Sequence, residues 1–262
     1  TSRPMRVSPT WSSSPSSVSV VIGASRGLGL AFATALLQRS PGTVIGCARD
    51  PGSSPALQKL KEESGGRLHC LSADVTKSES LTQLRDVLAA EHGRVDLLLN
   101  VAGILHEQAE GGTAMPERSL RTVDEEWMAR VFAVNAMGPV LCTQALQKLL
   151  KPGACVANLS ARVGSIGDNR LGGWWSYRMS KAALNMATKN MANEMRRSEV
   201  LAVALHPGTT DTDLSKPFQA NVKAEKLFTV EFTAGALLDV IEGLTPEDSG
   251  GFFAYDGSRI EY

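Results

Sequence analysis

The chain has 262 residues, of which 43% are hydrophobic and 21% are charged, values close to the globular average. Basic and acidic residues both number 27, so no overall charge favours nucleic acid or an anionic membrane as a partner. No apolar run approaches the roughly 20 residues that a membrane-spanning helix needs. The cysteines form no Cys-x-x-Cys pair and the histidines are scattered, so we expect free thiols and no metal site.

The first 17 residues, TSRPMRVSPTWSSSPSS, are rich in serine and contain no acidic residue. This composition predicts an extension over 1–17, either the remains of a tag before Met5 or the stub of an organelle-targeting peptide. We therefore set it apart from a predicted domain over 18–262. The expected compartment is the cytoplasm, with the mitochondrion or plastid as the alternative if the segment is a transit-peptide remnant.

From residue 18 onward, strand and helix patterns alternate along the chain. Short apolar runs predict seven strands, over 18–22, 43–48, 67–75, 95–103, 154–160, 200–208 and 250–257. Helical patterns fall between them, over 28–40, 55–64, 78–93, 122–150, 177–195 and 231–244. We expect the long helix 122–150 to bend at Pro139, and a long connection over 104–122 to precede it.

This alternation predicts an α/β fold, a single-domain doubly wound (Rossmann-type) sandwich with a mostly parallel seven-stranded sheet. In such folds ligands bind at the carboxyl ends of the strands. Polar or turn-forming residues follow six of the predicted strands: Gly23, Arg49, Asp74, Asn100, Ser160 and Pro207. That is more than packing requires, so the sequence predicts a ligand site at this edge.

A glycine-rich turn, GASRGLG over 23–29, lies between the first strand and the first helix. Glycines there let the backbone approach a pyrophosphate, which the free N–H groups of the helix N-terminus can bind. The alternative is that the glycines serve only tight packing between helix and strand. The strand–turn–helix context favours binding of a dinucleotide cofactor.

The end of the second strand indicates which dinucleotide. An NAD site needs an acidic residue there for the ribose 2′-hydroxyl, whereas this strand ends in Ala48-Arg49, and Asp50 comes one position later. Arg26 lies in the glycine turn, and two guanidinium groups could bind a 2′-phosphate. The alternative is that both arginines are solvated surface residues. We predict NADP(H).

Tyr177 and Lys181 lie four residues apart on a predicted helix and therefore share one face. An ammonium about 5 Å from a phenol, at an effective dielectric of about 20, favours the phenolate by about 3 kcal/mol. Such a pair can exchange a proton with a carbonyl that accepts a hydride. The alternative, an ordinary exposed helical pair, is common when the motif stands alone.

Taken in order, these motifs resemble the short-chain dehydrogenases/reductases over about residues 18–257. The resemblance rests on GASRGLG, NVAG (100–103), Asn135, Ser160, YRMSK (177–181) and PGTTDT (207–212). The stretches LSARVGSIGDNRLGGWWSYRMSKAALN and SGGFFAYDGSRI further resemble the C-factor-like and sniffer-like carbonyl reductases of that family. One departure is Val101, where the family usually has a second Asn.

The resemblance implies roles for individual positions. The catalytic tetrad would be Asn135, Ser160, Tyr177 and Lys181. In it, Ser160 would donate to the substrate oxygen, Tyr177 would be the acid/base tuned by Lys181, and Asn135 would hold a water. The cofactor would contact Gly23, Ser25, Arg26, Gly27, Leu28, Gly29, Arg49, Asp74, Val75, Asn100, Ala102, Gly103, Tyr177, Lys181, Pro207, Gly208, Thr210 and Thr212.

The substrate side is less defined. We expect it to be lined by Ser160, Trp174, Trp175 and Phe218. The tryptophans end an elaborated loop between Ser160 and Tyr177, and they could instead pack only against that loop. Phe218 lies in 213–228, whose place after a strand is typical of a mobile flap, with a static surface loop as the alternative.

The predicted function is reduction of a small-molecule carbonyl (aldehyde, ketone or quinone) to the alcohol with NADPH. The alternative is a cofactor-binding sensor or signalling protein of the C-factor type with little turnover. A third alternative, a nucleotide-sugar epimerase of the extended family, shares the Tyr-x-x-x-Lys motif but is disfavoured by the short C-terminal portion, which leaves no separate substrate domain. The resemblance also implies a homodimer or homotetramer through helices 122–150 and 177–195, with no nucleic acid or membrane partner.

Overall fold

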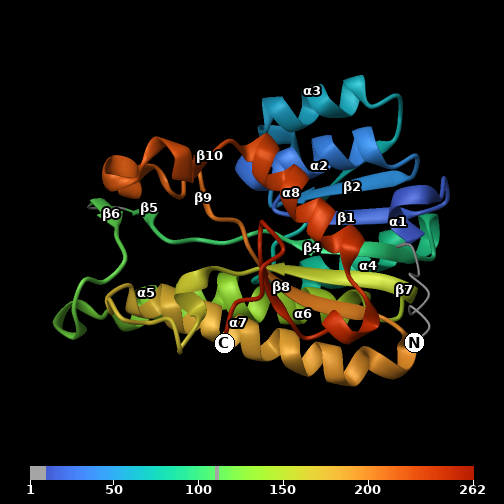
Figure 1. Cartoon of the computed structure of the whole chain (residues 1–262). Coiled ribbons are helices and arrows are strands. Elements are labelled where there is room, and N and C mark those ends of the chain that lie inside the picture. The colour runs from blue at the N-terminus through green and yellow to red at the C-terminus, as the bar shows by residue number, and fades with distance from the viewer. Residues whose placement is uncertain (1–9, 110–111) are drawn as a thin grey trace.

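A parallel seven-stranded sheet forms the centre of the computed structural model, which describes residues 10–109 and 112–262 (Figure 1). Its strand order is β11-β8-β7-β4-β1-β2-β3. The strands are β1 (Val18–Ile22), β2 (Thr43–Ala48), β3 (Leu68–Ser72), β4 (Val95–Asn100), β7 (Leu150–Leu159), β8 (Leu201–His206) and β11 (Phe252–Ala254). The chain winds outward from β1 in one direction and then from β4 in the other. This confirms the predicted doubly wound α/β fold.

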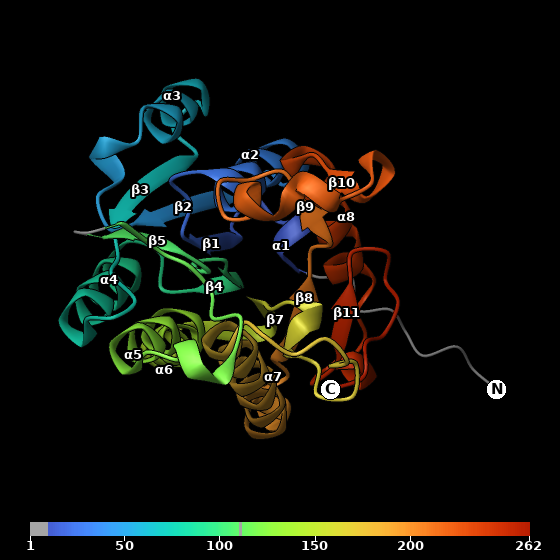
Figure 2. The ribbon, with the colours of Figure 1, turned by 90° about the vertical axis from the view of Figure 1, so that its left-hand side faces the viewer.

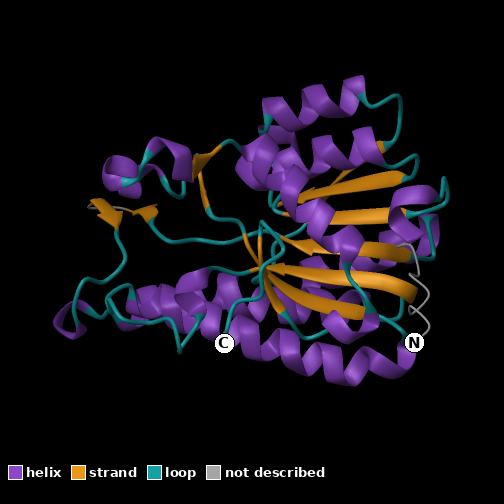
Figure 3. Ribbon diagram, in the orientation of Figure 1, coloured by secondary structure: helices purple, strands orange, loops and turns teal. Residues whose placement is uncertain are grey.

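Helices cover both faces of the sheet (Figure 3). On one face lie α2 (Gly27–Arg39), α3 (Pro55–Glu63) and α8 (Val230–Gly243), and on the other α4 (Ser78–Glu91), α6 (Gly138–Leu146) and α7 (Trp175–Met195). Each face has its own cluster of buried apolar side chains. Because both faces of the strands are covered, β1, β2 and β4 are buried along almost their whole length and are mostly apolar rather than alternating.

The helix predicted over 122–150 is three segments. A helix α5 (Glu125–Phe132) passes into a π-helical stretch over Ala133–Met137, and α6 then ends at Leu146. Pro139 has no N–H, so the ordinary helical hydrogen bond to the carbonyl of Asn135 is absent and the turn before the proline widens. The sequence predicted a bend at Pro139, and the structure has instead a π-helical stretch over 133–137, one turn before the proline.

The connection predicted over 104–122 contains a small antiparallel hairpin, β5 (Glu107–Ala109) with β6 (Gly112–Ala114). A second small pair, β9 (Thr209–Thr210) and β10 (Leu227–Phe228), closes the base of the loop 213–228. Both pairs lie beyond the same end of the sheet, on the left in Figure 1. They follow β4 and β8, so they stand at the carboxyl ends of the strands.

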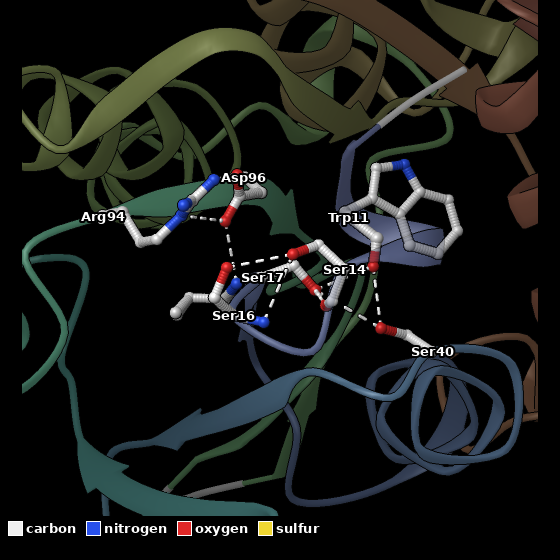
Figure 4. Close-up of polar contacts among 8 residues, drawn as sticks. Trp11, Ser14, Ser16, Ser17, Ser40, Arg94 and Asp96 are labelled. Atoms are coloured by element: carbon white, nitrogen blue, oxygen red, sulfur yellow. Dashed lines mark hydrogen bonds and ion pairs between the residues drawn. The ribbon is translucent and has the colours of Figure 1, made fainter.

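Residues 10–17, part of the predicted N-terminal extension, pack onto the fold; the rest of the extension lies outside the described residues. The short helix α1 (Thr10–Ser13) carries Trp11, which is completely buried in the core cluster with α2 and α8. The carbonyl of Trp11 accepts hydrogen bonds from Ser40 at 2.7 Å and Ser17 at 3.0 Å (Figure 4). Composition alone gave no sign of this packing.

Among the described residues, no helix is both long enough and apolar enough to cross a membrane.

Candidate active site

Helix α7 presents a polar row on its buried face. Tyr177, Lys181 and Asn185 follow one another at four-residue spacing, and each is at most 8% exposed. The Lys181 ammonium lies 5.6 Å from the centre of the Tyr177 ring and donates to the carbonyl of Leu159 at 2.7 Å. The exposed-pair interpretation of Tyr177 and Lys181 is therefore wrong, because both side chains are inside the protein.

Burial dominates the protonation of this pair. It raises the pKa of Tyr177 well above the ordinary value for tyrosine and lowers the pKa of Lys181 to about 8. The expected lowering of the Tyr177 pKa by the ammonium is thus outweighed by desolvation in this structure. At neutral pH the phenol keeps its proton and Lys181 is still mostly charged, which is the state that a proton donor needs.

Ser160 directly follows β7 and is fixed by α7. Its hydroxyl donates to the side-chain oxygen of Asn185 at 2.6 Å, and Asn185 donates in turn to the carbonyl of Gly164 at 3.3 Å. Asn185 was missed by the sequence analysis, although it continues the four-residue spacing of Tyr177 and Lys181. The structure therefore brings Ser160 to the same helical face as the tyrosine and lysine.

Asn135 lies in the π-helical stretch, completely buried. Its side chain accepts from the N–H of Ile104 and donates to the carbonyl of the same residue, both at 2.8 Å, and also donates to Ser180 at 3.2 Å. This side chain ties the segment after β4 to α7.

The glycine turn leaves the backbone open in the way a phosphate needs. Gly23 and Gly27 have φ of +93° and +53°, a conformation that favours glycine. A Cβ on Gly29 would stand 1.9 Å from the Gly23 carbonyl oxygen, and one on Gly27 would lie 3.5 Å from a methyl carbon of Thr212. The turn and the first residues after β9 are therefore neighbours, as the resemblance implies. Ser25 and Leu28 belong to the same turn and the start of α2.

The predicted phosphate-binding arginines differ in their surroundings. Arg26 precedes α2 and forms an exposed ion pair with Asp213, 3.0 Å apart. Arg49 follows β2 and is exposed, and its main-chain carbonyl accepts from Ser72 at 2.9 Å. No acidic side chain follows β2 before Asp50, whose carboxylate caps the next turn by accepting from Ser53.

Asp74 and Val75 lie just after β3. The Asp74 carboxylate accepts from the N–H and hydroxyl of Thr76 at 3.0 Å and 2.7 Å. Burial opposes ionisation of Asp74, but these hydrogen bonds, with the charges of Lys77 and Arg49, lower its pKa. Val75 is 8% exposed and packs against α6, where a Cβ on Gly138 would touch it.

Three other predicted cofactor positions form hydrogen bonds within the protein. Asn100 is buried, and its side-chain amide donates to Asn158 at 2.8 Å, which links β4 to β7. Ala102 donates its N–H to the carbonyl of Ile22 at the end of β1. The hydroxyl of Thr210 lies 3.0 Å from that of Thr233 in α8. Of the three, Ala102 lies directly against the glycine turn, since a Cβ on Gly23 would stand 2.8 Å from its nitrogen and 3.1 Å from its Cβ.

The remaining predicted positions lie along the same edge. A Cβ on Gly103 would stand 3.3 Å from the Asn135 side-chain oxygen and 3.7 Å from the Lys181 ammonium. Pro207 and Gly208 follow β8, and Gly208 turns the chain with φ of +73° toward β9. Thr212 adjoins the glycine turn as described above. The structure thus places the predicted cofactor positions around one edge of the sheet.

An aromatic group stands over Tyr177. The ring of Trp174 lies 6.2 Å from the Tyr177 ring and 4.8 Å from Phe218, centre to centre. Phe218 also lies 6.1 Å from His106, whose ring donates to the carbonyl of Asp213. Of the two tryptophans, Trp174 therefore faces the tyrosine, whereas Trp175 is exposed at the first position of α7. Figure 2 shows β5, β9 and β10 in front of the sheet at this edge.

Glu117 was not predicted from the sequence. It is 4% exposed and accepts from both the N–H and the hydroxyl of Ser176, in the first turn of α7. Its carbonyl accepts from the N–H of Trp174, whose φ of +50° is unusual for a side chain of that size. A buried carboxylate thus caps the helix that carries Tyr177. No local signal marks it, because it comes from the distant connection after β4.

The model of the short chain dehydrogenase family matches residues 17–223. The chain is a short-chain dehydrogenase. Its resemblance to the C-factor-like and sniffer-like members of the family is confirmed by the relatives below, and the family is one of oxidoreductases that use a nicotinamide cofactor.

Three relatives place this short-chain dehydrogenase within its family. C-signal of Myxococcus xanthus is 39% identical over 172 residues, covering 65% of this chain and 94% of the relative. NADPH-bound carbonyl reductase from chicken fatty liver is 29% identical, with a TM-score of 0.81 over 94% of this chain and 98% of that one. Carbonyl reductase Sniffer of D. melanogaster is 25% identical, with a TM-score of 0.82 over 95% of this chain and 100% of that one.

Proposed function

We propose that this chain reduces a small-molecule carbonyl to the alcohol with NADPH, and that Tyr177 donates the proton. The observation that carries the proposal is the buried row on α7, where Tyr177, the Lys181 ammonium and the Ser160–Asn185 hydrogen bond share one face. NADPH, when bound, would supply the hydride. The carbonyl reductases among the structural relatives support this reaction class.

The chain's own residues would divide the remaining work. Ser160 would turn its hydroxyl from Asn185 to the substrate oxygen and stabilise the negative charge that develops there. Tyr177, kept protonated by burial, would deliver its proton to that oxygen, and Lys181 would stabilise the resulting phenolate. Trp174 and Phe218 would exclude water from the reacting carbonyl.

The experiment is to compare NADPH consumption by the wild type and by Tyr177→Phe with a panel of aldehydes, ketones and quinones. We expect the variant to bind NADPH normally but to lose activity by at least 100-fold. Tyr255→Phe is the matched control, because Tyr255 packs against Phe228 and Phe232. Activity of Tyr177→Phe within about tenfold of the wild type would contradict the assignment.

The similarity to C-signal supports a second candidate, a protein that binds the cofactor without appreciable turnover. The same assay separates the two. A wild type that binds NADPH but reduces none of the carbonyls, while a carbonyl reductase assayed in parallel does, would favour the sensor.

The preference for NADPH would come from the basic corner at Arg26 and Arg49. Charge-assisted hydrogen bonds of about 1.5–3 kcal/mol each would bind the 2′-phosphate. We expect kcat/KM for NADPH to exceed that for NADH, to fall at least about tenfold in Arg49→Ala, and to reverse in Ala48→Asp, where a carboxylate repels the phosphate. Equal use of both cofactors by the wild type would show that the arginines are only surface charges.

The oligomeric state and the compartment remain predictions. An exposed apolar set on the outer side of the π-helical stretch, α6 and α7 supports association through these helices. It consists of Met137, Val140, Met179 and Met186. Light scattering of the purified protein measures its mass directly.

A further inference from the structure

A cluster of metal-binding side chains lies at the amino end of β3. It is formed by His69 in β3 and by Glu91 and His92 at the end of α4, and their ligand atoms all lie within 4.8 Å of one another. Asp74, at the cofactor edge, follows the other end of the same strand. The cluster therefore belongs neither to the candidate active site nor to its proposed reaction.

The fold brings these residues together by strand alternation and by the end of a helix. Leu68 and Cys70 pack into the apolar core on the face of the sheet that α3 covers. Because side chains alternate along a strand, His69 between them points to the opposite face, where α4 lies. Helix α4 ends at Glu91, and the capping residue His92 donates its N–H to the carbonyl of Leu88 at 3.0 Å before Gly93 follows with φ of +65°. A regular helix end thus fixes Glu91 and His92 against the edge strand.

His92 has a nitrogen without a hydrogen-bond partner. Its Nε2 is buried among the described residues and makes no hydrogen bond there, although it lies 3.8 Å from a carboxylate oxygen of Glu91. A buried polar atom normally has a partner, and this nitrogen is available to coordinate a metal ion. Two carboxylate oxygens and two imidazoles offer the nitrogen and oxygen donors that Zn²⁺ uses.

The arrangement of the two rings matches joint ligation. Their centres are 5.6 Å apart and their planes are 85° from each other. With Zn–N distances of about 2.0–2.1 Å, an imidazole centre lies about 3.2 Å from the ion, and two such rings at a tetrahedral angle have centres roughly 5 Å apart. The ring centres would shift by well under 1 Å, and the ligand atoms, which lie within 4.8 Å of one another, would close toward the roughly 3.4 Å that separates two donors around a tetrahedral zinc ion.

The local charge also favours a cation. The carbonyl groups at the end of α4 carry the negative end of the helix dipole, and Glu91 adds a full negative charge.

We propose that His69, Glu91 and His92 form a Zn²⁺ site that fastens α4 to the edge strand β3, with water in the remaining position. The sequence predicted no metal site, because the two histidines are far apart along the chain and only the fold joins them. The site would stabilise the protein and would take no part in catalysis.

The test is a titration of chelator-treated protein with ZnCl₂, followed by calorimetry and by the melting temperature. We expect one Zn²⁺ per chain and a higher melting temperature, since a ligand of the native state stabilises it. His69→Ala, His92→Ala and Glu91→Gln should each weaken binding by about tenfold or more. His106→Ala and Glu79→Gln, which remove the same groups elsewhere, should leave binding unchanged.

Two further measurements separate a loss of zinc binding from a loss of folding. The variants should melt like the wild type in chelator, and Co²⁺ added to the unaltered wild type should give the visible absorption of a four-coordinate site. Wild-type affinity no greater than that of the His69→Ala/His92→Ala double variant, or equal losses in the controls, would overturn the proposal. NADPH binding should not depend on Zn²⁺, so the outcome is independent of the proposed reductase activity.

Discussion

Lys181 is a buried cation, and its desolvation lowers the stability of the native state by an amount that depends on pH. Burial lowers its pKa to about 8 from 10.5, so between these values the unfolded chain binds a proton that the native state does not. Stability contributed by this group therefore rises as the pH rises above about 8. From about pH 8 to pH 9.5 the wild type should gain ~2 kcal/mol relative to Lys181→Met.

Urea denaturation of the two proteins at several pH values measures this difference. Tyr177 does not interfere in that range. Burial raises its pKa in the native state, so its ionisation in the unfolded chain lowers the stability of the protein only from about pH 10 upward. Parallel stability curves for Lys181→Met and wild type would mean that the lysine is not desolvated as the structure indicates.

Some site residues can be recognised from their near neighbours in the sequence, whereas others depend on contacts with residues far away in the chain. Tyr177 and Lys181 could be predicted because helical spacing is local, and Asn185 carries the same signal one turn further. Glu117 and Asp213 could not be predicted, because each acts on a residue far away in the chain, Ser176 and Arg26 respectively. The side chain of Asn100 lies on the face of the sheet covered by α6, where it donates to Thr143 and Asn158, and strand alternation alone does not decide which face it takes.

At the scale of elements, the N-terminus of α7 depends on the carboxylate of Glu117. Replacing it by Gln removes a charge that the helix dipole stabilises and leaves an amide N–H₂ group in a buried place. We expect Glu117→Gln to lower the free energy of unfolding by about 1–3 kcal/mol. If the proposed reaction is correct, kcat should fall by roughly tenfold while the Kd for NADPH stays the same.

Stopped-flow kinetics and urea denaturation give the two readouts. Glu126→Gln is the control, since Glu126 is an exposed acid in the first turn of α5. A variant whose stability falls but whose kcat is unchanged would show that the cap serves only folding and does not position Tyr177.

Element types were predicted better than element ends. Most of the seven strands are largely apolar because helices cover both faces of the sheet, so composition and length reveal them. The break at Ala133–Met137 was displaced from Pro139 because the missing N–H acts on the carbonyl four residues earlier. The β5–β6 hairpin was missed because its three-residue strands have no room for an alternating pattern.

For the whole molecule, the core extends further toward the N-terminus than the domain predicted over 18–262. Trp11 fills the layer between the sheet, α2 and α8. We expect Trp11→Ala to lower the free energy of unfolding by about 3–5 kcal/mol, the range for emptying a buried aromatic site. Leu171→Ala, at a position 91% exposed, should change it by less than about 0.5 kcal/mol. Equal stability of the wild type and Trp11→Ala would show that residues 10–17 are an extension that does not contribute to the core.

The ion pair between Arg26 and Asp213 connects the glycine turn with the loop that carries Phe218. A 2′-phosphate that bound Arg26 would release Asp213 and loosen one anchor of that loop. The binding of cofactor and of carbonyl would then be thermodynamically linked, and each would change the dissociation constant of the other by the same factor. Since an exposed ion pair is worth less than about 1 kcal/mol, the factor is a few-fold.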